Sequence, residues 1–588
     1  MPFRLLLLCL LLGTQSVLAQ TALTAQQAYD YLQNERHRAD KIVGDARQPP
    51  ADSLRRGEQI LLDALTYYHR PDIQALAKTN NYLRARKGDI SYDLALIQAK
   101  LGKTDAAATT LAFPLSGASA QFYAPHVLRD SAFVTVRQTP LVSGLLQKVK
   151  AASRVFNSDA LKTAYKPVLS EAEKVAGLSK IWSEAKYNFA YFDHVPDLDW
   201  DQLYLDYLPK VQAAPTTAAY YHVLESFIAQ LHDGHTDIWP TDPRLADSVA
   251  RRPPLRCVLV GNEVLVQEVL SDSLRQTGIR PGLVLVSIDG LPTKTYADRY
   301  VRPYQSGSTP QNIDVSTYTY ALLNGPKDRP VTLVFRDGTG KTFSRVLPRF
   351  GYGKLSPTPA FRFRVLPGNV AYVQLNNFEN SKALDGFVAA FDSIAQTNSL
   401  ILDVRLNGGG DSGYGWNILG YLTDKPMKTG SYSSRIYSPL RRARGEQVLF
   451  EAVGEDNTWP ANGKKIFTKP VAVLIGSRTF SAAEDFAVMF DAMQRGTLIG
   501  EPTGGSTGQP LVFALPGGVM ARVCTKRDAY PDGTEWNGKG IQPNLLVRPT
   551  VADVQAGRDP VLDAALAKLS IDVPGKPVRP RPRSSAQK

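Results

Sequence analysis

Cysteine is scarce in this sequence, with three residues in 588. Cys9 lies in the N-terminal apolar run, and Cys257 and Cys524 lie in strand-like apolar stretches. Two remaining thiols cannot make a disulfide framework or a zinc site, although they could pair in an oxidising compartment or stay as buried free thiols. Stability must come from apolar cores, and the length is several times a usual domain of about 150 residues.

Long apolar runs are missing after the first nineteen residues. Residues 1–19 carry Arg4, an apolar run from Leu5 to Leu12, and small residues ending at Ala19. This is the pattern of a cleaved signal peptide, whereas a membrane anchor needs roughly 20 apolar residues. The sequence therefore predicts a secreted or periplasmic protein with no stable membrane span.

Concentrated charge and cofactor motifs are missing as well. The formal net charge of +13 is scattered, and part of it lies in residues 572–588, a tail predicted to be disordered and basic. A nucleic-acid surface would need clustered basic residues with interleaved aromatics. The glycines do not form a phosphate-binding motif, and the histidines near residue 235 fit no metal motif. We expect no nucleic acid, no metal and no cofactor.

From the N-terminus onward the residue pattern is first helical and then strand-like. This order predicts a multi-domain α/β chain. Residues 20–168 read as a helical prefix domain in which Tyr92 to Ala108 resembles one tetratricopeptide unit. Residues 169–252 form a second helical region, with apolar spacings of three and four between Tyr220 and Leu231. This helix is predicted to stop at residues 232–236, where Gly234 can take the backbone values of a helix end.

Residues 253–350 alternate like short strands, over residues 257–260, 263–266, 282–289 and 331–335. The stretch from Arg280 to Gly290 resembles part of a PDZ domain, which binds an extended peptide at a sheet edge. The alternative is any small β-rich domain. Residues 351–571 then alternate strands, at 370–375, 400–405, 471–476 and 497–501, with helices, which predicts a sheet covered on both faces.

Three short segments could carry chemistry. Ser481 follows the strand at 471–476 and precedes a helix, so its hydroxyl and the N–H of Ala482 lie at a helix start, where an oxyanion can be stabilised. The alternative is a capping box in which Ser481 and Glu484 only satisfy helix-end N–H groups. Gly408 and Gly409 follow a buried strand and expose backbone N–H groups, although such glycines also make plain turns.

The third segment contains His235, which could serve as the base that a weak hydroxyl nucleophile needs or could simply cap a helix. Taken in order, Leu-His-Asp-Gly-His-Thr, the PDZ-like stretch, Leu-Ile-Leu-Asp-Val-Arg-Leu-Asn-Gly-Gly-Gly, Ser-Ala-Ala-Glu and Ile-Gly-Glu-Pro-Thr-Gly-Gly resemble one family. It is the serine peptidase family of C-terminal processing proteases, tricorn core proteases and interphotoreceptor retinoid-binding protein. The resemblance covers residues 165–570 and implies a ClpP/crotonase-like catalytic domain over residues 351–571.

The resemblance also implies roles for individual residues. Ser481 would be the nucleophile, and Gly408, Gly409 and Ala482 would supply the oxyanion hole. Members of the processing branch use a lysine as base, but Ser506 stands in its place here, so His235 would serve as in the tricorn-like branch. Glu535 would orient His235, unless it is an ordinary turn residue.

This chain departs from the tricorn-like pattern at one position, because Gly234 stands where those members have a serine. The sequence predicts a serine endopeptidase acting on protein or peptide substrates. The alternative is a non-catalytic protein on the same scaffold that binds peptides or apolar ligands.

Overall fold

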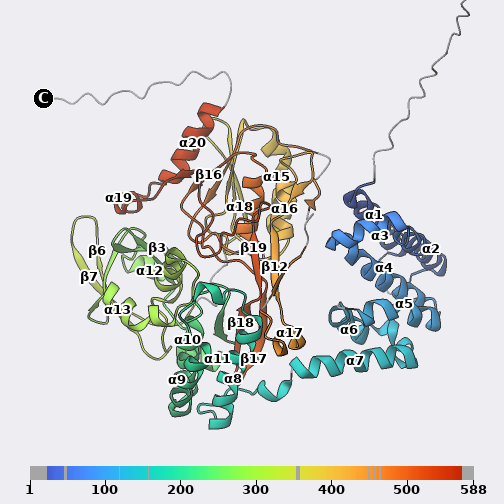
Figure 1. The fold of residues 1–588 in the computed structure, drawn as a ribbon. Coiled ribbons are helices and arrows are strands. Elements are labelled where there is room, and N and C mark those ends of the chain that lie inside the picture. The colour runs from blue at the N-terminus through green and yellow to red at the C-terminus, as the bar shows by residue number, and fades with distance from the viewer. Residues whose placement is uncertain are drawn as a thin grey trace, which may run out of the picture. The chain divides into compact units, whose positions relative to one another are not determined.

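The computed structural model describes residues 23–44, 49–117, 119–156, 158–351, 358–447, 449–453, 458–461 and 465–572. The predicted signal peptide and the predicted disordered tail from residue 573 onward lie outside the described residues. The chain forms two compact units, residues 1–150 and 151–588. Figure 1 shows the element labels used below.

The first unit is helical, as predicted. Its helices are α1 (Ala25–Val43), α2 (Ala51–Tyr68), α3 (Pro71–Thr79), α4 (Asn81–Lys100), α5 (Thr104–Ser116) and α6 (Ala120–Arg129), and α7 (Pro140–Phe156) crosses into the second unit. The stretch that resembles a tetratricopeptide unit folds as the end of α4 and the start of α5. Buried side chains from α4, α5 and α6, including Ala95, Leu111 and Tyr123, share one cluster, so the helices stabilise one another.

The second unit begins with helices that pack on a small antiparallel sheet. These helices are α8 (Glu171–Asn188), α9 (Trp200–Ala213), α10 (Thr217–Ala229) and α11 (Pro243–Val249). The sheet has the order β1 (Asp237–Pro240), β18 (Val519–Cys524), β17 (Pro510–Leu515). In Figure 1 the β17–β18 hairpin reaches down beside α8 and α10. Strand β1 begins two residues after His235. Its pairing with β18 joins it to a distant part of the chain, with Asp237 opposite Arg522.

A β-rich region follows, and the predicted strands are present. Its sheet has the order β2 (Leu255–Val260), β3 (Glu263–Val269), β4 (Val284–Ile288), β6 (Val331–Arg336), β7 (Thr342–Leu347), and β5 (Leu291–Pro292) pairs with β4. The helical segments here include α12 (Asp272–Gln276), α13 (Thr293–Tyr300), η5 (Arg302–Tyr304), α14 (Pro310–Asp314) and the π-helix η6 (Val315–Ala321). The PDZ-like assignment stays a prediction.

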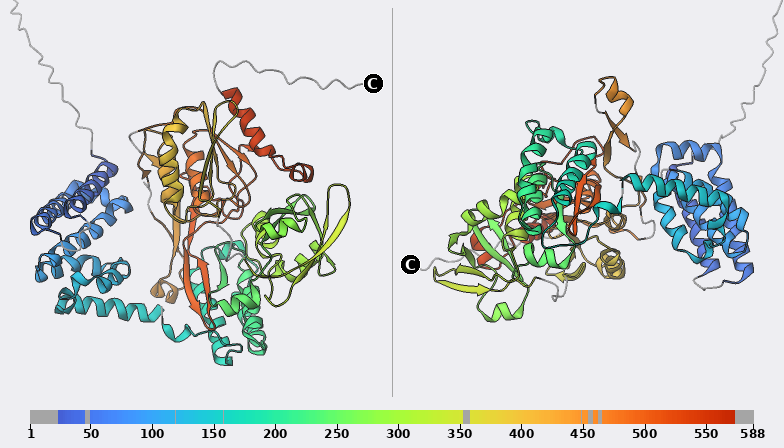
Figure 2. Two further views of the ribbon diagram at one scale, coloured as in Figure 1. Left: turned by 180° about the vertical axis from the view of Figure 1, so that it is seen from behind. Right: turned by 90° about the horizontal axis from the view of Figure 1, so that it is seen from below.

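The largest sheet lies in the C-terminal part and carries the strands predicted there. Its order is β20 (Leu545–Leu546), β16 (Thr497–Gly500), β15 (Val471–Ile475), β10 (Ser399–Asp403), β9 (Val370–Leu375), β8 (Phe361–Leu366), and only β8 is antiparallel to its neighbour within this sheet of described residues. One face packs on α15 (Lys382–Ala395), α16 (Ser412–Leu419) and α18 (Ala482–Ala492). The other packs on α20 (Pro560–Asp572) (Figure 2). Burial on both faces explains the nearly continuous apolar strands.

Smaller elements complete this part. The strand β12 (Ser431–Ile436) lies between β13 (Leu449–Val453) and β19 (Lys526–Ala529), and β11 (Met427–Lys428) pairs with β14 (Thr458–Trp459). Helix α17 (Pro439–Ala443) follows β12, and α19 (Val551–Gln555) precedes α20. Among the helices of the described residues, none is both long and apolar enough to cross a bilayer.

Candidate active site

Ser481 lies at a sharp turn between β15 and α18, as the sequence predicts. It is the residue just before the helix and is half-buried, with φ of 57° and ψ of −126°. A residue other than glycine rarely adopts this left-handed backbone, and the strain costs about 1–3 kcal/mol. Such strain persists only where surrounding contacts enforce it, so the contacts of this turn are informative.

Glu484 supplies several of those contacts. Its carboxylate accepts the backbone N–H of Ser481 at 3.0 Å, which is one half of the predicted capping box. It also accepts the Thr503 hydroxyl at 2.5 Å and the N–H groups of Gly505 and Ser506 at 2.7 and 3.2 Å. Burial raises the pKa of Glu484 to about 8, and these hydrogen bonds oppose the rise. Glu484 therefore ties the Ser481 turn to the loop containing Ser506.

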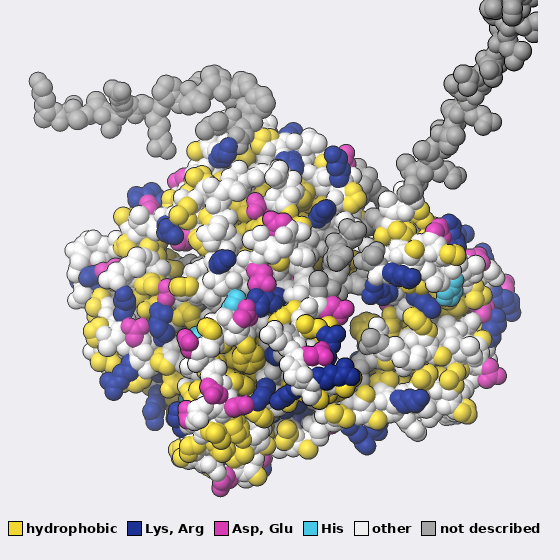
Figure 3. Space-filling view, viewed as in Figure 1, with side chains coloured by type: hydrophobic (Ala, Val, Ile, Leu, Met, Phe, Trp, Pro, Cys, Tyr) yellow, Lys and Arg dark blue, Asp and Glu magenta, His cyan; other side chains and the backbone are white. Residues whose placement is uncertain are grey.

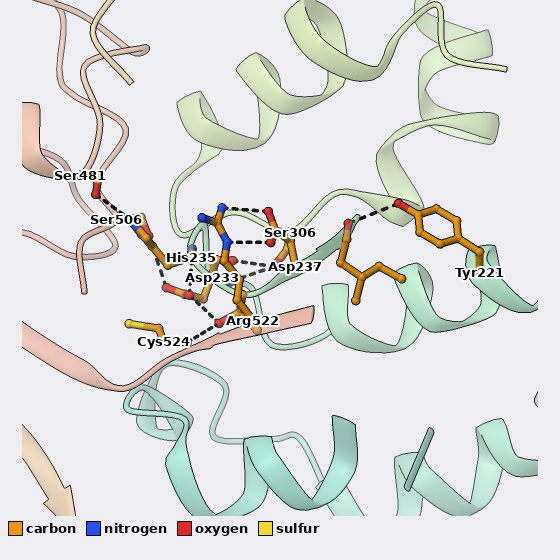
Figure 4. A network of polar contacts seen from close by, with 11 residues as sticks. Tyr221, Asp233, His235, Asp237, Ser306, Ser481, Ser506, Arg522 and Cys524 are labelled. Carbon is orange, nitrogen blue, oxygen red and sulfur yellow. Dashed lines mark hydrogen bonds and ion pairs between the residues drawn. The ribbon is translucent and has the colours of Figure 1, made fainter. Parts of the chain in front are cut away.

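The Ser481 side chain points to the base that the sequence predicts. Its Oγ lies 2.9 Å from Nε2 of His235, which is 246 residues away in the chain. On the other side of the ring, Nδ1 lies 3.0 Å from Oγ of Ser506. Figure 4 shows this row of side chains. The contact with His235 sets Ser481 apart from an ordinary helix cap.

The imidazole of His235 is enclosed. Its side chain is buried, and the Phe480 ring stacks on it with centroids 4.7 Å apart and planes 10° apart. Burial lowers the pKa of His235 well below its ordinary 6.5, and the positive charges of Arg522 and Lys526 lower it further. The ring is therefore neutral near pH 7, which is the form that can accept a proton.

The low pKa of His235 predicts how reactivity depends on pH. A neutral imidazole is required to activate Ser481, and protonation occurs only as the pH falls through the lowered pKa. We expect the rate of labelling by a fluorophosphonate to show no midpoint at pH 6.5 and to fall through His235 only below that pH, while any change near pH 8 would belong to Glu484. The rate constant measured against pH checks this, and a midpoint at 6.5 would contradict the burial of a neutral base.

The helix before His235 ends differently from the prediction. The left-handed backbone belongs to His232, with φ of 48°, and Gly234 does not have it. Glycine is needed at position 234 because a Cβ there would lie 2.6 Å from Asn312 Oδ1 and 2.9 Å from Ser506 Cβ. Gly234 thus permits close packing against the loop that meets His235.

Glu535 does not reach His235, which corrects the predicted third member of the site. Its carboxylate instead binds the guanidinium of Arg527 at 2.9 and 2.8 Å, and Arg527 also binds Asp193 at 2.7 Å. Since Ser481 and Ser506 occupy both ring nitrogens of His235, Glu535 cannot orient the ring directly. It belongs to a partly buried ion-pair network beside the site.

The predicted oxyanion donors lie at the turn. They differ in whether their N–H groups already donate a hydrogen bond. The N–H groups of Ala482 and Gly408 carry no hydrogen bond within the described part of the chain. The N–H of Gly409 donates to Oδ1 of Asn407 at 2.9 Å, so it is occupied. Gly409 nevertheless packs against the turn that carries Ser481, since a Cβ on it would lie 2.7 Å from Cβ of Ser481.

Asp233 and Phe480 are site residues that sequence reasoning missed, and Ser506 was noted only as the replacement of a lysine. Asp233 stands two residues before His235, and Phe480 directly precedes Ser481, so closeness in sequence was an available signal. Nothing in the local pattern around Ser506 indicates contact with a histidine 271 residues earlier.

The described residues contain no group of three or more His, Cys, Asp or Glu side chains that could hold a metal ion. Cys257 and Cys524 are both buried free thiols, and they lie in different core clusters. The polar residues that meet at the turn are therefore a hydroxyl, an imidazole and their hydrogen-bond partners, an arrangement suited to nucleophilic attack by serine.

Comparison with known proteins agrees with this chemistry. Residues 369–547 match the model of peptidase family S41. Carboxyl-terminal-processing peptidase 2 of Arabidopsis thaliana is 25% identical over 284 residues, which are 48% of this chain and 49% of that protein. The carboxyl-terminal-processing protease of a Synechocystis strain is 26% identical over 320 residues, or 53% of this chain and 65% of the relative. The crystal structure of mature CPAF with lactacystin shares the fold, with a TM-score of 0.53, 14% identity, and coverage of 68% of this chain and 99% of that one.

Over residues 369–547 the chain is therefore similar to the peptidases of family S41. The match spans roughly half to two thirds of the length of these two curated relatives.

Proposed function

We propose that this chain is a serine endopeptidase that cleaves protein or peptide substrates through an acyl-enzyme on Ser481. The observation that carries the proposal is the 2.9 Å contact between Ser481 Oγ and His235 Nε2 at a strained turn. The match of residues 369–547 to peptidase family S41 supports the same reaction type. The relatives are named for processing carboxyl termini, which favours protein substrates.

In the first half of the reaction, Ser481 Oγ attacks the peptide carbonyl carbon while its proton passes to Nε2 of His235. The carbonyl oxygen becomes an oxyanion, which the N–H of Ala482 and a donor from the 408–409 loop would stabilise. When the tetrahedral intermediate collapses, the C–N bond breaks and the imidazolium donates its proton to the amine that leaves. An ester to Ser481 remains.

In the second half, His235 takes a proton from water as the water attacks the ester. Breaking the ester bond returns the proton to Ser481 and releases the carboxylic acid. Neutral His235 suits this cycle because it must accept a proton twice and return it twice. Ser506 in the place of the processing-branch lysine supports His235 as the base.

The location of the protein is part of the proposal. The segment of residues 1–19 favours export, so we propose that the peptidase acts outside the cytoplasm, in the periplasm or as a secreted protein. The visible face in Figure 3 has Lys and Arg side chains scattered among acidic and apolar ones, which fits a solvated surface better than a nucleic-acid interface.

Labelling with a fluorophosphonate tests the proposed nucleophile. We expect one covalent adduct, located on Ser481 by mass spectrometry, and no adduct on Ser481→Ala or His235→Ala protein of matched thermal stability. A well-folded wild-type protein that neither labels nor cleaves an unfolded protein would instead favour the non-catalytic peptide- or apolar-ligand-binding alternative.

A further inference from the structure

The row of polar contacts at His235 continues away from Ser481. The Ser506 hydroxyl, which meets Nδ1 of His235, lies 3.4 Å from Oδ1 of Asp233 and donates to it. We propose that Ser506 and Asp233 are positioning residues that hold His235 in the tautomer able to accept the Ser481 proton. This inference rests on the proposed function. It assigns to Asp233 and Ser506 the orienting role that the sequence predicts for Glu535.

The surroundings of Asp233 suit a carboxylate that accepts hydrogen bonds. Its side chain is almost completely buried, with the residue 1% exposed. Oδ2 accepts the backbone N–H of His235 at 3.0 Å and the Thr236 hydroxyl at 2.7 Å, and Oδ1 accepts the hydroxyls of Ser308 at 3.1 Å and Ser506. Burial raises the pKa of Asp233, and the hydrogen bonds from Thr236, Ser308 and the His235 N–H together with the charge of Arg522 oppose that rise. Four donors around two oxygens match an ionised carboxylate.

The charge on Asp233 determines the direction of every hydrogen bond in the row. A carboxylate only accepts, so the Ser506 hydroxyl donates to it and offers a lone pair to His235. Nδ1 of His235 then carries the ring proton and donates to Ser506. Nε2 is left without a proton and faces the hydroxyl of Ser481, as a general base must. The negative charge also stabilises the imidazolium that forms during the reaction.

Two separate parts of the chain hold the two positioning residues. Ser306 exchanges hydrogen bonds with the backbone of Asp233, at 3.1 Å to its N–H and 2.7 Å to its carbonyl. Glu484 accepts the N–H of Ser506 from the other side. Figure 4 shows Asp233 and Ser506 meeting next to His235. Since Glu484 also binds the N–H of Ser481, the relay and the nucleophile turn share one support.

Asp233→Asn tests the relay because it should reverse the direction of the hydrogen bonds that link residue 233, Ser506 and His235. The His235 N–H can only donate, so the amide oxygen should keep that contact and the amide NH₂ should face Ser506. The Ser506 hydroxyl would then donate to Nδ1, and the proton would sit on Nε2, against Ser481. We expect the fluorophosphonate labelling rate to fall at least about 10²-fold, since a wrong tautomer disables the base. The ring nitrogens of His235, observed by NMR in ¹⁵N-histidine-labelled protein, should change from the Nδ1–H to the Nε2–H form.

Two further variants make the test decisive. Ser506→Ala removes the link but leaves the other three donors of Asp233, so we expect a similar fall in rate and loss of a single Nδ1–H form. This variant decides the matter if Asp233→Asn does not fold. Glu535→Gln is the matched control, with a rate within about threefold of wild type and an unchanged tautomer, because Glu535 binds Arg527.

The relay is wrong if Asp233→Asn and Ser506→Ala label at the wild-type rate, or if both keep the Nδ1–H tautomer. Failure of the proposed function gives a different result, namely a folded wild-type protein that does not label at all. The NMR signal of His235 still tests the relay in that case, because it does not depend on reaction. His235→Gln protein assigns the signal.

Discussion

Ser481→Ala is expected to abolish hydrolysis of an unfolded protein substrate, lowering kcat by at least about 10⁴-fold. The hydroxyl that forms the ester is lost, and Nε2 of His235 loses its partner at 2.9 Å. Only binding and oxyanion stabilisation would remain to accelerate attack by water. Initial rates of cleavage of unfolded casein measure the effect, with thermal unfolding recorded for each variant.

Ser477→Ala is the matched control for that experiment. It removes a hydroxyl from the same turn, four residues earlier, and this side chain makes no hydrogen bond within the described residues. Its rate should stay within about threefold of wild type. If Ser481→Ala keeps a tenth of the wild-type rate at equal protein stability, Ser481 is not the nucleophile.

Gly409→Ala is expected to produce the second large loss. The added Cβ would lie 2.7 Å from Ser481 Cβ and 2.8 Å from the Phe480 carbonyl oxygen, at a φ of 101° that alanine rarely adopts. The nucleophile turn or the glycine loop must move, and each displacement by about 1 Å can cost about 10²-fold in rate. Because oxyanion donors on both sides would move too, we expect a loss of about 10⁴-fold in kcat. Strain and overpacking should lower the free energy of unfolding by about 3 kcal/mol.

The neighbouring glycine provides the comparison. A Cβ on Gly408 would meet no atom within 4 Å, and its φ is not left-handed. Gly408→Ala should therefore reduce kcat by less than about tenfold and change the free energy of unfolding by less than about 1 kcal/mol. Equal effects of the two substitutions on kcat and on denaturant unfolding would show that contact with Ser481 is not what makes Gly409 necessary.

Periodicity was sufficient to locate most elements of the C-terminal sheet. Each predicted strand there reappears within two residues of its expected bounds, because a parallel strand buried on both faces must be apolar throughout. The Ser481 turn was equally accessible, since a buried strand followed at once by a helix leaves few paths for the chain. The helix end near His235 was less so, because the reason for Gly234 lies in contacts with Asn312 and Ser506 from distant segments.

Local sequence patterns could not identify the residue that orients His235. The chain has 55 acidic residues, and the motif order pointed to Glu535. Strand pairing decides otherwise, since β19 ends just before the turn that carries Glu535 and places Arg527 where it captures that carboxylate. Asp233 meets the site instead through the serine loop packed beside it.

The sequence by itself indicated the resemblance to a peptidase family, the order of the elements, the nucleophile candidate and the histidine candidate, because these depend on short-range pattern and on motifs. Only the tertiary structure decided which side chains touch. Pairing of β1 with β18 brings residues more than two hundred positions apart into register, and packing of the 503–508 loop against Gly234 brings Ser506 to His235. Contacts of that kind come from the packing of whole elements, and no single segment of sequence specifies them.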